Sequence, residues 1–239
     1  MKLLYYIPAF GEPQMDIKYD ILVHNLRYIY TRTLVPLDLC ISFYTVSEEI
    51  KEKLKHLPYL STAYIYECKG VLTELFLTNP HNEHVSKYDY VFFVLDDVKI
   101  KQMDIPRMIS IKQEHQIEVL SPQIINSTHW FMKEGNNLTL NNAIEIFFIV
   151  LTPQEFTRFC SIHTVENKWM WGVDFLFGFY KIKAGILHTC VAEHVLASLS
   201  DKGNANDLMI EYLKQHTPYT GIWGQIDKDY PCIISTINV

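Results

Sequence analysis

The first hundred residues alternate between apolar runs and stretches in which apolar residues recur at helical spacing. The apolar runs occupy residues 3–10, 37–45, 62–68 and 88–97. Between the first two runs, apolar residues follow the period of an α-helix at Ile17, Ile21, Leu22, Leu26 and Ile29. Alternation of strands and helices predicts an α/β fold, with a mainly parallel central sheet flanked by helices.

Three of these strands end in residues that can carry chemistry. Pro8–Phe10, Glu67–Gly70 and Asp96–Asp97 all stand at carboxyl ends. Parallel strands bring their carboxyl ends to one edge of the sheet, where α/β proteins bind their ligands. We therefore expect these three segments to converge on one binding edge.

The second half of the chain is less regular. Asp104 followed by Pro106 predicts a helix start, and Thr152-Pro153-Gln154-Glu155 has the pattern of a capping box. The remaining patterns predict strands at 117–125, 142–151 and 184–195, and helices at 174–183 and 205–215. No segment resembles a linker, so we expect one domain over 1–239, with a nucleotide-binding half (1–100) and a half that completes the site (101–239).

Composition excludes several classes of protein. The 239 residues are 49% hydrophobic and 20% charged, which is typical of a globular domain, and the net charge of −6 offers no basic surface for nucleic acid. The apolar runs are too short for a membrane span, and Pro8 and Gly11 interrupt the only stretch that resembles a signal peptide. Five scattered cysteines favour a reducing compartment. We expect a soluble cytoplasmic protein.

The segment "YVFFVLDDVKI" (90–100) places Asp96 and Asp97 directly after an apolar strand. A single aspartate here would usually cap a turn or helix. Two successive carboxylates repel each other unless a cation or hydrogen-bond donors lie between them. Carboxylate oxygens suit Mg²⁺ or Mn²⁺, whose coordination is often completed by substrate phosphates. The pair therefore indicates either a turn or a metal–phosphate site.

The segment "NKWMWGVDFLFGFY" (167–180) supplies a second candidate. Trp169 and Trp171 can form an apolar platform for a sugar, Gly172 allows close approach, and Asp174 can act as a base toward a hydroxyl group. The alternative is a core helix whose Asp174 caps its own N-terminus.

Two further segments could complete a site. In "HTCVAEHV" (188–195), His194 becomes a candidate ligand only if it lies near Asp97, and His188 and Glu193 compete with it. Lys69, followed by Gly70, could meet a phosphate or could be a solvated charge at a strand end. Neither a Walker nor a dinucleotide-binding glycine pattern occurs.

Together these segments resemble the GT-A class of nucleotide-sugar glycosyltransferases, whose hallmark is an Asp-x-Asp-type signature closing the fourth strand. A GT-A-like family of poorly assigned biochemistry carries "YDYIF–DED", a strand ending in Gln-Pro, a Val-Glu strand, Trp-Gly-x-Asp and a late Val-x-His. This chain has, in that order over residues 85–195, "YDYVFFVLDD", "IEVLSPQ", "IEIFFIVLTPQEF", "MWGVD" and "VAEHV". Small viral and microbial glycan-building transferases are also similar.

The resemblance implies roles for individual residues. Asp97 matches the metal-binding aspartate, and His194 matches the histidine that completes the metal site. Asp96 takes the place that faces the ribose or the sugar, although Leu95 stands where a first acidic residue is usual. Asp174 matches the base of inverting enzymes, and Glu145 matches an acceptor or donor contact.

The resemblance also implies a reaction. A hexosyl or pentosyl group would pass from a nucleoside-diphosphate donor, by default a UDP-sugar, to a glycan or glycoprotein hydroxyl with Mn²⁺ or Mg²⁺. Pro8, Ala9 and Phe10 would line the base and ribose pocket. Two alternatives remain open: a metal-independent glycoside hydrolase using Asp97 and Asp174, and a sugar- or nucleotide-binding module that has lost catalysis.

Overall fold

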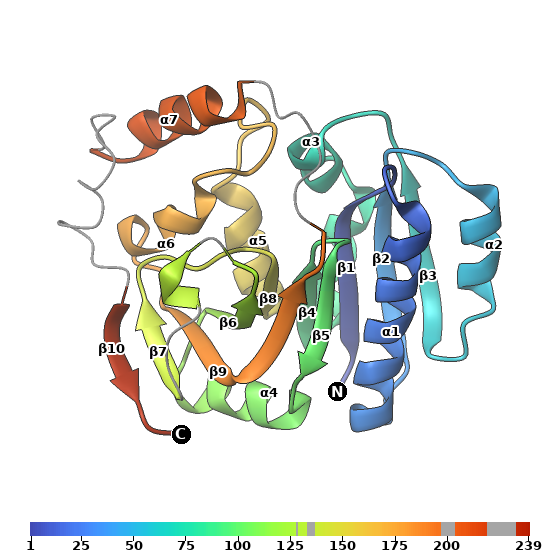
Figure 1. The fold of residues 1–239 in the computed structure, drawn as a ribbon, viewed down its shortest axis with the longest axis horizontal. Helices are drawn as coiled ribbons and strands as arrows, with labels where there is room; N and C mark the ends of the chain where they lie inside the picture. Colours follow the sequence, from blue (N-terminus) through green and yellow to red (C-terminus); the bar gives the residue numbers. More distant parts are fainter. Residues whose placement is uncertain (128, 133–136, 197–203, 219–232) are drawn as a thin grey trace.

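The fold is described from a computed structural model covering residues 1–127, 129–132, 137–196, 204–218 and 233–239. A 10-stranded sheet runs through the described part of the chain (Figure 1). In its first half, four strands lie in the order β3-β2-β1-β4 and run parallel: β1 (Leu3–Phe10), β2 (Leu37–Phe43), β3 (Leu60–Glu67) and β4 (Tyr90–Val94). The expected α/β class with a mainly parallel central sheet is confirmed.

The second half continues the same sheet with mixed pairings. Its strands are β5 (Val98–Gln102), β6 (Val119–Ile125), β7 (Leu138–Asn141), β8 (Phe148–Leu151), β9 (Ala184–His194) and β10 (Ile233–Ile237). β8 joins the two halves by pairing antiparallel with both β4 and β6, whereas β6 and β9 run parallel. The sequence patterns did not predict β5, β7 or β10.

Helices cover the sheet and connect its strands (Figure 1). They are α1 (Met15–Thr33), α2 (Glu48–Lys55), α3 (Leu72–Leu77), α4 (Ile105–Glu114), α5 (Pro153–Ser161), α6 (Leu176–Phe179) and α7 (Ala205–His216), with 3₁₀ turns at Pro80–Lys87, Trp130–Met132 and Val173–Phe175. The predicted starts at Asp104 and Thr152 are confirmed, because these side chains accept bonds from the first turns of α4 and α5. Ser47 caps α2 in the same way. No described helix is long and apolar enough to cross a membrane.

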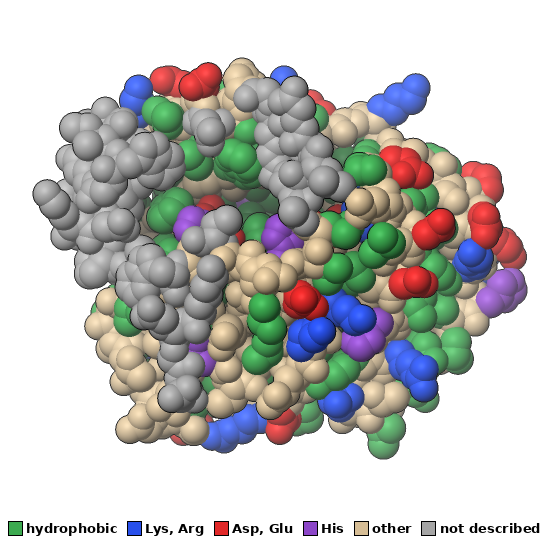
Figure 2. All heavy atoms as spheres, viewed as in Figure 1, with side chains coloured by type: hydrophobic (Ala, Val, Ile, Leu, Met, Phe, Trp, Pro, Cys, Tyr) green, Lys and Arg blue, Asp and Glu red, His purple; other side chains and the backbone are tan. Residues whose placement is uncertain are grey.

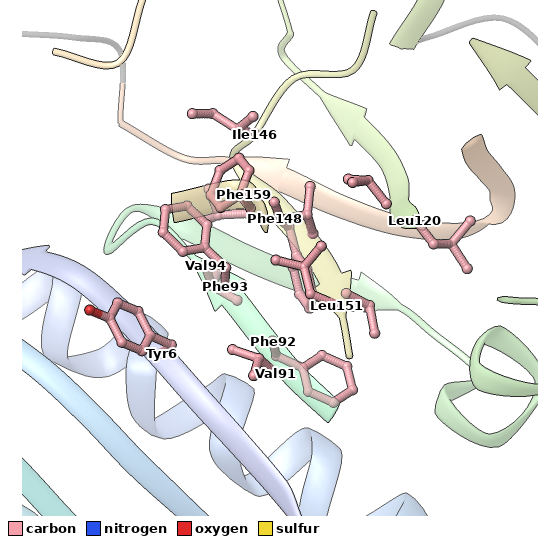
Figure 3. Close-up of a cluster of buried hydrophobic side chains, with 14 of the residues drawn as sticks. Tyr6, Val91, Phe92, Phe93, Val94, Leu120, Ile146, Phe148, Leu151 and Phe159 are labelled. Atoms are coloured by element: carbon pink, nitrogen blue, oxygen red, sulfur yellow. The ribbon is translucent and has the colours of Figure 1, made fainter. Parts of the chain in front are cut away.

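The apolar core lies on both faces of β4 (Figure 3). Every residue of this strand is buried, as its unbroken apolar run predicted. Phe92 packs edge-on to Phe148, with ring centroids 6.1 Å apart, and Phe93 packs against Phe159 at 5.3 Å. The strand that precedes the two aspartates is therefore anchored from both sides.

Two predicted elements are shorter in the structure. The strand expected at 142–151 covers only β8, and the helix expected at 174–183 becomes a 3₁₀ turn followed by the short α6. The reason lies in the backbone: Ile144 N donates to Asp174 O at 3.1 Å, and Gly178 N donates to Asn142 O at 3.0 Å. These bonds tie the two segments to each other, so residues 142–147 form a loop.

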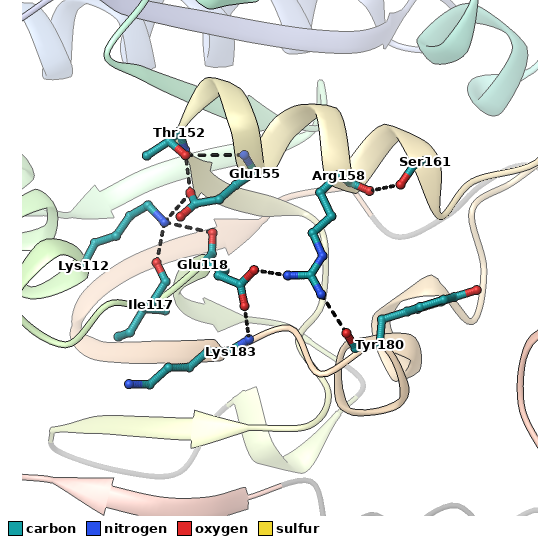
Figure 4. A network of polar contacts seen from close by, with 9 residues as sticks. All are labelled: Lys112, Ile117, Glu118, Thr152, Glu155, Arg158, Ser161, Tyr180 and Lys183. Atoms are coloured by element: carbon teal, nitrogen blue, oxygen red, sulfur yellow. Dashed lines mark hydrogen bonds and ion pairs between the residues drawn. The ribbon is translucent and has the colours of Figure 1, made fainter.

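A buried lysine holds α4, α5 and the start of β6 together (Figure 4). Lys112 Nζ forms an ion pair with Glu155 Oε2 at 2.6 Å and donates to the carbonyl oxygens of Ile117 and Glu118 at 2.5 and 2.8 Å. Its side chain is 3% exposed. The lysine thus satisfies three acceptors that water reaches poorly.

We expect Lys112→Met to lower the free energy of unfolding by about 3 kcal/mol, because it removes the cation that pairs with a partly buried carboxylate and donates to two carbonyl groups. Urea unfolding followed by tryptophan fluorescence measures this change. Lys55→Met is the matched control, since Lys55 and Glu52 form an ion pair whose side chains are both 60% exposed. Such a pair contributes less than about 1 kcal/mol. Equal losses in the two variants would contradict this account of Lys112.

Candidate active site

Asp97 and His194 lie side by side, although 97 positions separate them in the chain. Asp97 Oδ2 is 2.9 Å from His194 Nε2. The unpredicted strand β5 brings the two residues together. It begins directly after the aspartates and pairs antiparallel with β9, in a register that places Val98 opposite His194. The backbone of Val195 also donates to Asp97 O at 2.9 Å. The condition that made His194 a candidate ligand is therefore met.

The competing candidates lie elsewhere. His188 is buried and shares a hydrogen bond with the Thr139 hydroxyl, and Glu193 forms an ion pair with Lys101 at 3.0 Å. Of the three residues in this strand, His194 is the one paired with Asp97.

The Asp97–His194 pair suits a divalent cation by its chemistry. Both side chains are 18% exposed, so a ligand can reach a carboxylate oxygen and an imidazole nitrogen that already lie close together. This donor set fits Mn²⁺ better than Mg²⁺. Within the described ranges no cluster of three or more His, Cys, Asp or Glu side chains could hold a metal. A cation here would need the remaining ligands from substrate phosphates or water.

Asp96 faces a lysine that the sequence analysis did not single out. Asp96 Oδ2 forms an ion pair with Lys18 Nζ at 2.9 Å, and the lysine also donates to Gly11 O at 2.8 Å and to the Tyr44 hydroxyl at 3.2 Å. Burial raises the pKa of Asp96 to about 7, against the effect of the Lys18 charge, and the neighbouring Asp97 adds to the rise. The first aspartate thus connects the β4–β5 turn to the loop after β1.

The other predicted donor residues lie at the carboxyl ends of β1 and β3. Pro8 is buried, Ala9 is partly exposed, and Phe10 is fully buried with its ring 5.2 Å from that of Phe43. Lys69 is exposed beyond the end of β3. A depression of about 550 Å³ opens between the loops after β1 and β2, lined by residues that include Glu12, Asp16, Thr45 and Ser47.

A second cluster joins Asp174 and Glu145 through His129, which the sequence analysis missed. His129 Nε2 lies 3.4 Å from Asp174 Oδ2 and 4.0 Å from Glu145 Oε1. The Glu145 side chain is only 5% exposed, and its Oε2 has no hydrogen-bond partner among the described residues. Burial raises the pKa of Glu145, and the charge of Asp174 adds to the rise. A lone histidine between two strands carries no sequence signal that could have identified it.

Asp174 does not cap a helix. The 3₁₀ turn that contains it begins after Gly172 and has no side-chain cap bond. Gly172 has φ +83°, and a Cβ there would lie 2.8 Å from Met209 Cγ of α7, so its backbone and its packing both require glycine. Trp169 and Trp171 are half-buried on the same segment.

The loop 142–147 connects the two clusters. Glu145 approaches His129 at one point of this loop, and Phe147 packs against the His194 ring with centroids 4.6 Å apart. Figure 2 shows that the surface is hollowed beside α7, with histidine (purple) and acidic (red) side chains visible in the hollow. The Asp97–His194 pair and a carboxylate–imidazole cluster are thus brought to one region by residues from both halves of the chain.

Comparison with known proteins identifies the fold. No family model matches the sequence, and no curated protein is detectably similar to it. Among solved structures, GalNAc-T7 with UDP, GalNAc and Mn²⁺ superposes with a TM-score of 0.64 at 7% identity, covering 97% of this chain and 55% of that chain. TarS 1-349 of S. aureus with UDP superposes with a TM-score of 0.54 at 11% identity, covering 92% of this chain and 73% of that chain. The complex of TarS 1-349 with UDP-GlcNAc superposes with a TM-score of 0.52.

These neighbours are GT-A glycosyltransferases, so the chain has a GT-A-like fold. At 7–11% identity the likeness concerns the fold alone. The chain spans about half the length of the GalNAc-T7 structure.

Proposed function

We propose that this protein is a metal-dependent glycosyltransferase that moves a sugar from a nucleoside-diphosphate donor, by default a UDP-sugar, to a hydroxyl of a glycan or glycoprotein. One observation carries the proposal: Asp97 follows the fourth strand of a GT-A-like sheet, and its Oδ2 lies 2.9 Å from Nε2 of His194 at the end of β9. Structural neighbours that contain UDP and Mn²⁺, or UDP-GlcNAc, support the choice of donor and cation.

Asp97 and His194 would hold Mn²⁺ or Mg²⁺. When bound, the cation supplies positive charge and Lewis acidity where the leaving diphosphate gains negative charge. Pro8, Ala9 and Phe10 would border the nucleobase and ribose from the carboxyl end of β1, with the buried Phe10 bracing the loop that follows. Lys69 would approach a phosphate, and Asp96, held by Lys18, would border the ribose or sugar.

Asp174 would act as the base. The acceptor oxygen forms a bond to the anomeric carbon while the bond from that carbon to the diphosphate oxygen breaks, and the bonding electron pair leaves with the diphosphate. The acceptor's proton passes to a carboxylate oxygen of Asp174, whose side chain is 13% exposed. This displacement inverts the anomeric centre. Glu145, Trp169, Trp171 and Gly172 would border the acceptor.

The proposal assigns complementary tasks to the two halves of a single domain. Residues 1–100 would bind the nucleotide and supply Asp97, whereas residues 101–239 would supply His194, Asp174 and the acceptor side of the site. β8 and the β5–β9 pairing join these halves within one sheet.

A donor screen tests the function. The protein is incubated with UDP- and GDP-linked hexoses and pentoses, a mixed glycan acceptor and Mn²⁺, and the released nucleotide is measured. We expect acceptor-dependent release from one donor, which a chelator abolishes. Cleavage of glycosides without metal would instead identify a hydrolase, and nucleotide binding without any turnover would identify a binding module.

A further inference from the structure

His129 is placed between two carboxylates but has no role in the reaction described above. Its Nε2 lies 3.4 Å from Asp174 Oδ2 and 4.0 Å from Glu145 Oε1. The three side chains come from separate parts of the chain: His129 from the β6–β7 connection, Glu145 from the 142–147 loop, and Asp174 from the 3₁₀ turn before α6. The fold therefore assembles a carboxylate–imidazole–carboxylate array around the proposed base.

Two aromatic rings fix the plane of the imidazole. Phe131 stacks on His129 with centroids 5.1 Å apart and an interplanar angle of 17°, and Phe175 meets it edge-on at 5.5 Å and 87°. The His129 backbone N–H also donates to Ser127 Oγ at 3.0 Å. Since Phe175 follows Asp174 directly, the ring and the carboxylate are held by the same short turn.

The charges in this array favour a proton on the imidazole. If both carboxylates were ionised and Nε2 carried a lone pair, that nitrogen would face two negative charges within 4.0 Å. A proton on Nε2 removes this repulsion and turns the imidazole into a donor toward Asp174. The Glu145 side chain is almost out of solvent and also faces Nε2, where a negative charge on it favours the protonated ring.

We propose that His129 is a positioning residue for Asp174. Its Nε2–H points to Asp174 Oδ2, which leaves Oδ1 of the same carboxylate directed at the acceptor hydroxyl. Phe131 and Phe175 hold the ring in place, and the carboxylate of Glu145, 4.0 Å from Nε2, favours the proton on that nitrogen. This inference rests on the proposed transferase function, because it assigns His129 a task in the step that Asp174 performs. Positioning of this kind raises the rate of the chemical step without changing the affinity for the donor.

Three substitutions at one position test the proposal by steady-state kinetics. We expect His129→Leu to lower kcat by about 100-fold with the donor KM unchanged. His129→Gln retains more activity, within about 10-fold of the wild type, because its amide N–H reaches the place of Nε2. In His129→Gly, free imidazole added to the assay can enter between Phe131 and Phe175, and it should restore kcat by about 10-fold. The control is His56→Asn. His56 is an exposed residue at the C-cap of α2 and pairs with a glutamate of the same helix.

A wild-type kcat in His129→Leu would overturn the proposal. The proposal would also be overturned if donor affinity and melting temperature fell together with activity and imidazole did not restore kcat. That result would show a purely structural role for His129. A second measurement needs no turnover: the ring ¹⁵N resonances of His129 should shift in Asp174→Asn and in Glu145→Gln, while those of His56 do not. Unchanged His129 resonances would overturn the inference, whereas absent turnover with shifted resonances would count against the proposed transferase function alone.

Discussion

Replacing Asp97 with alanine is expected to weaken binding of a nucleoside diphosphate in the presence of Mn²⁺ by at least about 100-fold, equivalent to about 2.8 kcal/mol. The substitution removes one of only two side chains proposed to hold the cation, and His194 alone cannot keep a divalent ion beside the phosphates. The dissociation constant of the nucleotide, measured calorimetrically with Mn²⁺, gives the size of the effect.

Asp89→Ala is the matched control for this variant. Asp89 precedes β4, whereas Asp97 follows it, and it pairs with the chain's first residues at the other end of the strand. Nucleotide affinity in the control should equal that of the wild type. If Asp97→Ala also keeps its affinity, the two aspartates only form a turn after the strand.

Replacing Asp174 with asparagine is expected to lower kcat by about 1,000-fold while leaving the dissociation constant of the donor within about two-fold of the wild type. The amide has nearly the same shape as the carboxylate but cannot take a proton from the acceptor hydroxyl. Asp174 is placed with Glu145 and His129, apart from the Asp97–His194 pair, so donor binding has no need of its charge. Initial rates and a donor titration separate the two effects.

Asp207→Asn provides the control, because Asp207 is an exposed residue in the first turn of α7. It should transfer sugar at the wild-type rate. Near-normal turnover in Asp174→Asn would show that Asp174 is not the catalytic base. The assignment of the donor site would stand. Loss of donor binding in the same variant would place Asp174 in the donor site instead.

The fold was largely predictable because its signals are local. Apolar runs of strand length, together with Ser47, Asp104 and Thr152 at helix starts, depend only on neighbouring residues. The strand expected at 142–151 failed in its first part because Ile144 bonds to the backbone of Asp174, a contact between distant segments. Apolar residues in a loop that packs against a core look the same as those of a strand.

Site residues that directly follow a strand were predictable from the sequence. Contacts between site residues from distant segments were not. Asp97 and His194 were recognisable individually, but their contact depends on β5, a short strand that the patterns did not reveal. Lys18 gave a weak signal, as a charged residue on the buried stripe of α1 beside Ile21 and Leu22. Nothing distinguished His129, since the groups around it come from three separate segments.

The most direct test of the central claim is a calorimetric titration of UDP and GDP into the wild-type protein, with Mn²⁺ and again with excess chelator. The account predicts that one nucleotide, UDP by default, binds with Mn²⁺ and that its binding is lost with the chelator. That result would establish the donor site and identify the nucleobase of the donor. If neither nucleotide binds with Mn²⁺ present, or if binding is the same with the chelator, the claim that Asp97 and His194 hold a metal for a nucleotide-sugar donor is contradicted.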